Sequence, residues 1–472
     1  MKPHFTRRDL MKVLSAAGFG TLISSTVRAD APTGAAAAGP APAAAGASAP
    51  AAGSATFCGQ VIAPTVPPHA PAALVGGQVV QPQRTLPVLH QADVLVVGGG
   101  SAGVMAAIAA RRAGAKTAII ERYGYFGGLW TGGMVLLVIG THVKDGAGKK
   151  KVVRGLGDEL LERLKKIDGA IINQDPGAHN PTADPEATKF IMDEMVREAG
   201  VDVFFHCWGA DAVMDGKTIR GVVFESKAGR QAILAKVVVD ATGDGDIFAA
   251  AGAEYVQRTY AIGTVHRHGN MDRIEKGKAP AGTKLPPLGG VTPLPSLTWV
   301  NTRGPKENGL DVAALSRLEM DHRRDIWNRL RQIKQTPGYE SIFIADTAPQ
   351  LGVRITRVLV GTCTLTYQEM RAGKKFPDVV AVGGAQGANH AGWPIPYGVL
   401  VPKEIDNLLT AGRSVSADEK LLDDTRLIAA CLTTGHAAGA AAAVAAQSGC
   451  RPRDVDIAKV QELLTEQGAY LG

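Results

Sequence analysis

Residues 93–111 read Asp93-Val-Leu-Val-Val-Gly-Gly-Gly-Ser-Ala-Gly-Val-Met-Ala-Ala-Ile-Ala-Ala-Arg111, and this stretch indicates the fold more strongly than any other. The apolar run Val94–Val97 predicts a buried parallel strand. Gly98, Gly100 and Gly103 follow at the spacing of a dinucleotide-binding turn. In such a turn the first glycine permits a tight bend, the second lets the backbone approach a diphosphate, and the third lets the following helix pack closely.

The residues around this turn supply the context that a dinucleotide site requires. Ser101 and Ala102 open an Ala-rich predicted helix, whose N-terminal N–H groups and positive dipole end favour a diphosphate. A second predicted strand ends at Glu121, within reach of ribose hydroxyls. This order predicts dinucleotide binding, against the alternative of a Gly-rich turn in an ordinary α/β protein.

Composition favours a globular protein with two domains or one elaborated domain. The chain has 472 residues, of which 45% are hydrophobic and 20% are charged. Its formal net charge is +7, but residues 1–29 carry five Lys or Arg and one acid, which leaves +3 for the rest. Because the sequence also has no basic run interleaved with aromatic residues, we expect no nucleic-acid partner.

The cysteines argue against a disulfide framework, a haem attachment site and a zinc site. They number five, they are scattered, and they contain no C-x-x-C pair: Cys58, Cys207, Cys363, Cys431 and Cys450. We therefore expect no metal, and we expect these side chains to act as small hydrophobes.

The N-terminus resembles a twin-arginine export signal. Arg7 and Arg8 precede a weakly apolar stretch, Val13–Val27, and Val27-Arg-Ala29 resembles a cleavage site. We predict a signal peptide over residues 1–29, an Ala/Pro/Gly-rich linker over 30–90 and a periplasmic location. Because this pathway exports folded proteins, the cofactor would be bound before export.

The middle of the chain alternates helix and strand signals. Asp184–Gly200 predicts a capped helix with Pro185 at its first position, and Val201–His206 predicts a strand. A three-stranded meander is expected over residues 210–235. The strand 236–240 then leads directly into Ala241-Thr-Gly-Asp-Gly-Asp246.

Residues 253–400 differ in composition and predict an inserted domain with a long amphipathic helix over 311–335. The chain then returns with a strand over 407–413 and a small-residue helix over 426–447. That helix is long enough to cross a bilayer, but its Ala, Gly and Thr content makes it weakly hydrophobic. We expect it to pack inside the fold rather than span a membrane.

Together these motifs resemble the FAD-dependent oxidoreductase family with the glutathione-reductase-like FAD fold. The matching segments are Val96–Gly103, Glu121–Gly128, Asp184–Ala187, Val239–Asp246, Ala348–Arg354, Ile395–Pro402, Asn407–Arg413 and Arg426–Gly439. The resemblance implies an α/β fold: a discontinuous, three-layered, Rossmann-like FAD-binding domain over 91–252 and 401–472, with an inserted α+β substrate domain over 253–400.

The resemblance also implies which residues hold FAD. The glycines of the first turn would contact the diphosphate, Glu121 the adenosine ribose, and the backbone of Ala210 the adenine. The residues implied for the flavin side are Gly127, Gly128, Thr131, Gly243, Asp244, Gly412 and Arg413, together with Leu427 and Ile428 at the start of the last long helix. Related flavoproteins often have Gly-Asp where this chain has Gly412-Arg413, so the chain departs from the family pattern at this position.

Candidates for catalysis come from the inserted segment and its return. His390 and Tyr397 flank Trp393-Pro-Ile-Pro396 and are candidate acid–base residues, whereas Arg354 and Arg426 could hold a carboxylate. Each also has a structural alternative, as a packed imidazole or phenol or as a brace between domains. Further candidates of lower rank are His266 and His268; the pair Asp423-Asp424 is expected to cap a helix or to be exposed.

These features predict an exported FAD-dependent dehydrogenase or oxidase that takes a hydride from a small organic substrate. Because the sequence has no second G-x-G-x-x-G, electrons would pass to a cytochrome, a quinone or oxygen rather than to a separate nicotinamide domain. The alternatives are a reductase driven by an external donor and a flavoprotein whose FAD has a lyase, isomerase or structural use.

Overall fold

A computed structural model describes residues 66, 69–146, 148–173, 180–384 and 392–472. The chain divides into two units, and all described residues belong to the second, Ala63–Gly472. The predicted signal peptide, Cys58 and His390 lie outside the described residues.

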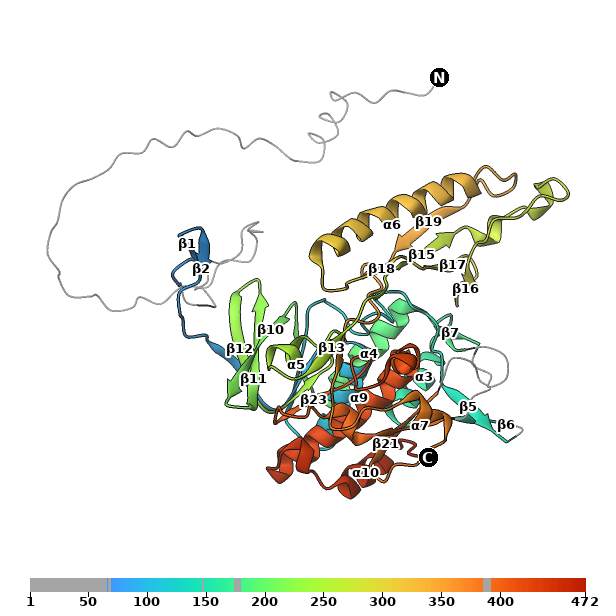
Figure 1. Ribbon diagram of the computed structural model, residues 1–472. Helices are drawn as coiled ribbons and strands as arrows, with labels where there is room; N and C mark the ends of the chain where they lie inside the picture. The colour runs from blue at the N-terminus through green and yellow to red at the C-terminus, as the bar shows by residue number, and fades with distance from the viewer. Residues whose placement is uncertain (1–65, 67–68, 147, 174–179, 385–391) are drawn as a thin grey trace, which may run out of the picture. The chain divides into compact units, whose positions relative to one another are not determined.

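The largest sheet of the described residues has seven strands, of which Figure 1 labels β10, β11, β12 and β23. The Gly-rich turn follows β3, inside this sheet. The strand order is β10-β11-β12-β3-β4-β9, with β23 also pairing with β12. The parallel pairs are β3 with β4 and β12, β4 with β9, and β12 with β23. Bounds are β3 Val88–Val97, β4 Thr117–Glu121, β9 Asp202–Phe205, β10 Trp208–Asp215, β11 Thr218–Ser226, β12 Gly229–Asp240 and β23 Leu408–Thr410. The ends of β3, β4, β12 and β23 therefore meet at one edge of the sheet.

The meander differs from its prediction in one respect. The expected strands 231–235 and 236–240 form one continuous strand, β12. Its first half pairs antiparallel with β11 and its second half pairs parallel with β3 and β23. No turn residue interrupts Ile233–Val239, so the strand leaves the meander and enters the parallel sheet without a break.

Helices cover one face of this sheet. They are α2 Ser101–Arg112, α3 Leu156–Leu164, α4 Pro185–Ala199, α9 Ile428–Ser448 and α10 Ile457–Glu466. The predicted caps of α4 are confirmed, because Asp184 accepts hydrogen bonds from two backbone N–H groups and Gly200 is left-handed.

The small residues of α9 let it press against α2. A Cβ at Gly435 or Gly439 would overlap the carbonyl oxygen of Ala102 or Ala106 on α2. Among the described residues, α9 is the one helix long and apolar enough to cross a membrane, but 89% of its most apolar window is buried inside the fold. The structure thus packs α9 as a core helix.

The other face of the sheet packs against the meander and the short helix α5 (Asp246–Ala250). Alternation along β3 divides the two cores: Val94 and Val96 join the helices, whereas Leu95 and Val97 join β11 and α5. The predicted three-layered α/β fold is confirmed.

The inserted segment is mixed α and β, as predicted. Its four-stranded sheet has the order β16-β17-β15-β19, and the helix α6 packs against it. Asp311 caps α6 by accepting a hydrogen bond from the N–H of Ala313 at 2.9 Å. Bounds are β13 Tyr255–Gln257, β14 Tyr260–Ala261, β15 Thr264–Gly269, β16 Gly290–Val291, β17 Thr298–Thr302, β18 Lys306–Glu307, α6 Val312–Ile333, β19 Phe343–Thr347 and β20 Arg357–Leu359, with short 3₁₀ turns at Met271–Arg273 and Lys276–Lys278.

The predicted boundary at residue 400 is wrong. The two-stranded sheet of β21 (Val379–Gly383) and β22 (Trp393–Pro396) packs its apolar side chains into the same core as α2 and α9. The chain therefore rejoins the first domain before residue 400. The remaining elements are β5 His142–Asp145, β6 Gly148–Lys151, β7 Ile171–Ile172, β8 Thr182–Ala183, α7 Tyr367–Arg371 and α8 Leu422–Thr425, with 3₁₀ turns at Tyr397–Leu400, Glu419–Leu421 and Pro452–Asp454.

The predicted linker, 30–90, is also too long at its C-terminal end. Residues Ala73–Val75 (β1) and Gln78–Val80 (β2) form an exposed hairpin, and β3 begins at Val88, where it already pairs with Ala232. The sequence predicted a linker here because Pro and Gly are interspersed among the apolar residues of this segment.

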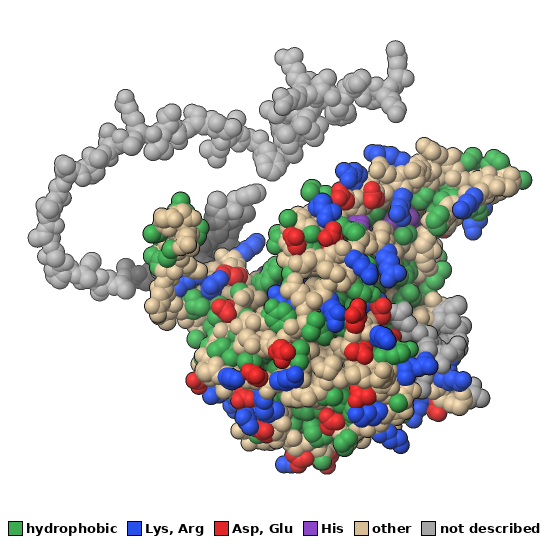
Figure 2. Space-filling model, in the orientation of Figure 1, with side chains coloured by type: hydrophobic (Ala, Val, Ile, Leu, Met, Phe, Trp, Pro, Cys, Tyr) green, Lys and Arg blue, Asp and Glu red, His purple; other side chains and the backbone are tan. Residues whose placement is uncertain are grey.

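Charges of both signs are interspersed over the described surface that Figure 2 shows. This agrees with the small net charge that the sequence leaves outside residues 1–29. Many exposed ions are paired along helices, such as Arg323 with Glu319 at 2.6 Å on α6.

Candidate functional site

The Gly-rich turn has the geometry that its spacing predicts. Gly98 has φ +100°, and a Cβ there would lie 2.6 Å from the carbonyl oxygen of Ala241. A Cβ at Gly103 would overlap the carbonyl oxygen of Gly98. Gly100, by contrast, caps α2 and has open space, since its Cβ would meet only the Cα of Gly128 at 4.0 Å. Two glycines are thus required by the fold, and the third leaves room for a ligand.

Glu121 is fixed at the foot of this turn. One carboxylate oxygen accepts from the N–H of Gly99 at 2.6 Å, and the other accepts from the N–H of Tyr123 at 2.8 Å. Burial raises the pKa of this carboxyl, although the two backbone hydrogen bonds oppose the shift. Each oxygen keeps a lone pair that can accept from a hydroxyl, as binding a ribose requires.

A second Gly-rich turn lies against the first. Gly127 and Gly128 both have positive φ, and the N–H of Gly127 donates to the carbonyl oxygen of Gly99 at 2.8 Å. Thr131 packs behind this turn, and its hydroxyl donates to the carbonyl oxygen of Phe126 at 2.6 Å. Thr131 does not line the cavity described below, so it supports the turn rather than facing a ligand.

The end of β12 is organised by a buried carboxylate that the sequence analysis missed. Asp240 accepts four hydrogen bonds, from the N–H and hydroxyl of Thr242 and from the N–H groups of Ile247 and Phe248, at 2.7–3.0 Å. Burial raises its pKa to about 6. The sequence feature that could have indicated this role of Asp240 is an acidic residue at the end of an apolar strand, shortly before Thr-Gly.

Arg413 pairs with Asp244 beside this turn. The guanidinium donates to the Asp244 carboxylate at 2.7 Å, and the Thr356 hydroxyl donates to the same oxygen at 2.8 Å. Gly243 allows this approach, because a Cβ there would overlap the guanidinium. The unusual Gly412-Arg413 sequence thus ties the end of β23 to the Gly243-Asp244 turn.

These turns surround a cavity of about 790 Å³, within the usual range of ligand pockets, roughly 300–1,000 Å³. Its walls include the start of α2, the two Gly-rich turns, the ends of β12 and β23, and residues of the inserted segment. The predicted cofactor residues that line it are Gly98, Gly100, Ser101, Ala102, Glu121, Gly127, Gly128, Gly243, Asp244, Gly412, Arg413, Leu427 and Ile428. The glycine cradle, the helix N-terminus and the ribose acceptor fit FAD.

The predicted adenine contact is misplaced. Ala210 is exposed and does not line the cavity, whereas Trp208, two residues earlier on β10, does. The guanidinium of Arg122 lies 4.8 Å from the ring centre of Tyr123 and 5.0 Å from that of Trp208. The planar side chains of Arg122, Tyr123 and Trp208 therefore lie together at this end of the cavity. In the sequence, the aromatic residue Trp208 at the start of a strand is the feature that could have indicated this.

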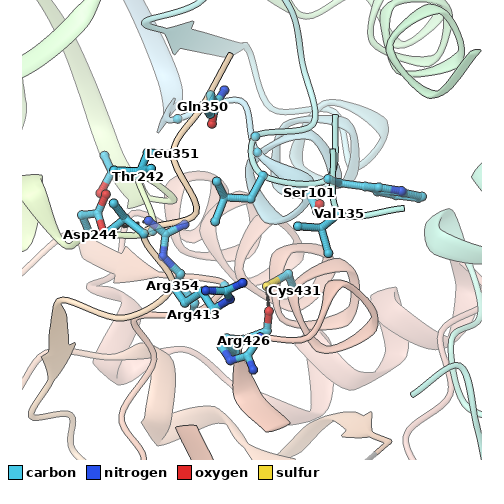
Figure 3. A pocket seen from close by; sticks show the side chains of 18 of the residues that line it. Ser101, Val135, Thr242, Asp244, Gln350, Leu351, Arg354, Arg413, Arg426 and Cys431 are labelled. Carbon is cyan, nitrogen blue, oxygen red and sulfur yellow. Dashed lines mark hydrogen bonds and ion pairs between the residues drawn. The ribbon is translucent and has the colours of Figure 1, made fainter. Parts of the chain in front are cut away.

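Three arginine side chains from different parts of the chain come together in the cavity. Figure 3 shows Arg354, Arg413 and Arg426 close together, facing Ser101 and Val135 across the cavity. Arg354 donates to the carbonyl oxygen of Ala261 at 2.8 Å and to the Asn301 side chain at 2.9 Å. Burial and the charge of Arg426 lower the pKa of Arg354, so the site favours an anion beside these cations.

Apolar side chains line the cavity beside these arginines. Val135 and Leu137 come from the first domain, and Trp299, Leu315 and Leu351 come from the inserted segment. An apolar wall with a few fixed charges is typical of a small-molecule site.

Tyr397 is not a site residue. It is 5% exposed, it belongs to the core shared by α9 and β22, and its hydroxyl donates to the carbonyl oxygen of Pro452 at 2.8 Å. Burial raises its pKa strongly. His266 and His268 are likewise buried, on β15, and do not line the cavity. His390 lies outside the described residues.

Asp423 is exposed, as one of the predicted alternatives has it, and it also lines the cavity. It accepts hydrogen bonds from Arg426 at 2.7 and 3.0 Å and from the hydroxyl of Tyr260. Within the described ranges, no group of three or more His, Cys, Asp or Glu side chains is arranged to hold a metal ion.

Comparison with known proteins agrees with this geometry. A family model described as FAD dependent oxidoreductase matches residues 93–265 and 259–464. The thiamine thiazole synthase of Methanococcus vannielii is 32% identical over 168 residues, which is 33% of this chain and 57% of that protein. The chain thus spans little more than half of that relative's length.

Two solved structures match this chain at low identity and low TM-score. A geranylgeranyl bacteriochlorophyll reductase-like protein from Thermoplasma acidophilum has a TM-score of 0.44 and 18% identity, covering 80% of this chain and 84% of that one. Thermovibrio ammonificans THI4 has a TM-score of 0.27 and 24% identity, covering 35% of this chain and 64% of that one.

Proposed function

The chain belongs to the FAD-dependent oxidoreductase family, and we propose that it is an exported dehydrogenase or oxidase that removes a hydride from a small organic anion. The observation that carries the proposal is the continuity of the cavity. One space reaches from the glycine cradle of Gly100 to Arg354 in the inserted segment. A ligand held at Arg354 would share that space with FAD.

FAD supplies the two-electron acceptor for this chemistry. The chain's own residues bind and orient. The two Gly-rich turns and Glu121 would hold the dinucleotide, while the Asp244–Arg413 pair braces the turn at the end of β12. The N-terminus of α9 begins at Ile428 beside the cavity, and its dipole favours negative charge there.

Arg354 and Arg426 support an anionic substrate. Each already donates to an acceptor that fixes its direction, Asn301 for Arg354 and Asp423 for Arg426, so the guanidinium groups are oriented before a ligand arrives. A carboxylate held there would be ordered against the apolar wall of Trp299 and Leu351.

Anaerobic mixing with a panel of small carboxylates tests this proposal. A substrate would bleach the visible flavin band, and a cytochrome, a quinone analogue or oxygen would restore it. Normal FAD content with no bleaching by any compound would contradict a dehydrogenase or oxidase. Bleaching by an external donor alone would instead support the reductase alternative.

Export rests on Arg7 and Arg8 in the predicted signal. Replacing both with Lys is expected to retain the protein in the cytoplasm with its FAD bound. Unchanged periplasmic recovery of the double variant would contradict this route.

A further inference from the structure

Most titratable side chains among the described residues that line the cavity are already engaged by neighbouring groups. Among the described residues that line it there is no histidine. Glu121 accepts from two backbone N–H groups, Asp244 pairs with Arg413, and Asp246 pairs with Arg357 at 2.9 Å. These carboxylates are committed to holding the fold of the cofactor end.

Two other lining groups are poorly suited to proton transfer. The Cys431 thiol donates to the carbonyl oxygen of Arg426 at 3.8 Å, and burial raises its pKa to about 11. Glu319 lies on α6 and pairs with Arg323 at 2.6 Å. The thiol is therefore protonated and directed away at neutral pH, and the carboxylate is neutralised by its neighbour.

Tyr260 is held differently. It lies on β14 at the cavity wall, and its hydroxyl donates to Oδ1 of Asp423, which follows β23 in the returning part of the chain. Arg426 donates to the same oxygen through Nε at 3.0 Å and Nη2 at 2.7 Å. The Arg426 guanidinium also lies 5.6 Å from the centre of the Tyr260 ring. The phenol is thus held in one orientation by two charged partners.

This arrangement connects the cavity to solvent. The Tyr260 side chain is partly buried, whereas the side chain of Asp423 is 53% exposed. A proton that reaches Asp423 can pass to bulk water. Hydrogen-bonded groups in this order, from a closed site to an exposed carboxylate, have the geometry of a proton relay.

We propose that Tyr260 is a catalytic residue, which takes a proton from an O–H or N–H group of the substrate and passes its own to Asp423. This rests on the proposed function. The substrate O–H or N–H bond breaks and its proton bonds to Oη of Tyr260. At the same time the Oη–H bond breaks and that proton bonds to Oδ1 of Asp423. The electron pair stays on the substrate heteroatom, which makes the neighbouring C–H hydrogen a better hydride donor.

The charges around the pair set its resting state. Burial raises the pKa of Tyr260, so the phenol is protonated at rest. Burial also acts to raise the pKa of Asp423, but the hydrogen bonds from Tyr260 and Arg426 and the charge of Arg303 lower it overall. Arg354, in the inserted segment, also interacts electrostatically with Tyr260 and Asp423. The lowered pKa keeps Asp423 ionised, so it can accept a proton and release it to water, and the relay stops in acid, where this carboxyl protonates.

The test compares Tyr260→Phe and Asp423→Asn with wild type, using a carboxylate that bleaches the wild-type flavin. Tyr367→Phe is the matched control, since Tyr367 lies on α7 and does not line the cavity. Two quantities are measured: the anaerobic bleaching rate at saturating substrate across pH, and the affinity of the dithionite-reduced enzyme for the same compound by calorimetry. Reduced enzyme cannot take a hydride, so the second quantity reports binding without turnover.

We expect Tyr260→Phe to lower the bleaching rate by about 10² to 10⁴, the usual contribution of a general acid or base, with the affinity unchanged. Asp423→Asn should lower the rate and abolish the acid limb of the wild-type pH profile. An unchanged rate in Tyr260→Phe, or a loss of affinity alone, overturns the inference and leaves the proposed function standing. If no compound bleaches the wild type, the proposed function fails and the inference fails with it.

Discussion

The two ends of the cavity are built in different ways. The cofactor end consists of backbone and glycine, placed where parallel strands end side by side, as at Gly98 and Gly243. The substrate end consists of long charged side chains, Arg354, Asp423 and Arg426, brought together from segments far apart in the chain. The first kind of site tolerates almost no side chain, whereas the second depends on the identity of each one.

The largest expected effect is a loss of the fold at the cofactor end. Gly103→Ala would drive a methyl group into the carbonyl oxygen of Gly98, so we expect a destabilisation of more than about 4 kcal/mol and little soluble protein. Chemical denaturation of any soluble fraction measures this.

Gly277→Ala is the control for that variant. Gly277 lies in the inserted segment, and a Cβ there would meet nothing within 4 Å. Equal stability of the two variants would show that the close approach of α2 and β3 is not required.

Acid should destabilise the fold through His436 on α9. Burial lowers the pKa of His436 to about 4, although its hydrogen bond with Gln467 opposes the shift. In the unfolded state His436 takes up a proton near pH 6.5, whereas in the folded state it does so only near pH 4. Between these two values protonation favours the unfolded state, so the free energy of unfolding is highest above pH 6.5 and falls as the pH drops toward 4.

His436→Gln should remove about 3 kcal/mol of this acid dependence, at 1.36 kcal/mol per pKa unit. Denaturation at several pH values measures it, with the exposed His69→Gln as the control. Parallel curves for His436→Gln and wild type would refute the assignment.

Replacing one arginine at each end with alanine tests whether the two ends have separate roles. Arg413→Ala breaks the pair with Asp244 and should weaken FAD retention, whereas Arg354→Ala should leave FAD content intact. We expect Arg354→Ala to weaken carboxylate binding about 10- to 100-fold, in the range of lost charge-assisted hydrogen bonds. Flavin absorbance and ligand titration separate the two effects. Loss of FAD from both variants would mean that the ends are not distinct.

The different construction explains what could be predicted from the sequence. The strand, turn and helix around Gly98, Gly103 and Glu121 could be predicted, because their order in the sequence determines where those residues lie. Ala210 does not line the cavity although Trp208 on the same strand does, and the register of β10 shifts between Gly209 and Asp211.

The substrate end could not be predicted in the same way. Tyr260 and Asp423 are 163 residues apart and meet only through the packing of the inserted segment on the returning chain. Tyr397 has the chemistry of a catalytic residue, but apolar neighbours on β22 carry it into the core. No local pattern distinguishes these two tyrosines.

We expect FAD to bind at the open space beside Gly100, in a turn otherwise closed by its own backbone. The most direct measurement is the FAD stoichiometry of purified Gly100→Ala beside wild type, with folding checked by circular dichroism. A Cβ at Gly100 meets no protein atom closer than 4.0 Å, so the variant should fold. We predict wild-type protein with one FAD per chain and a folded variant with little or none. A folded variant that retains FAD as wild type does would contradict the claim.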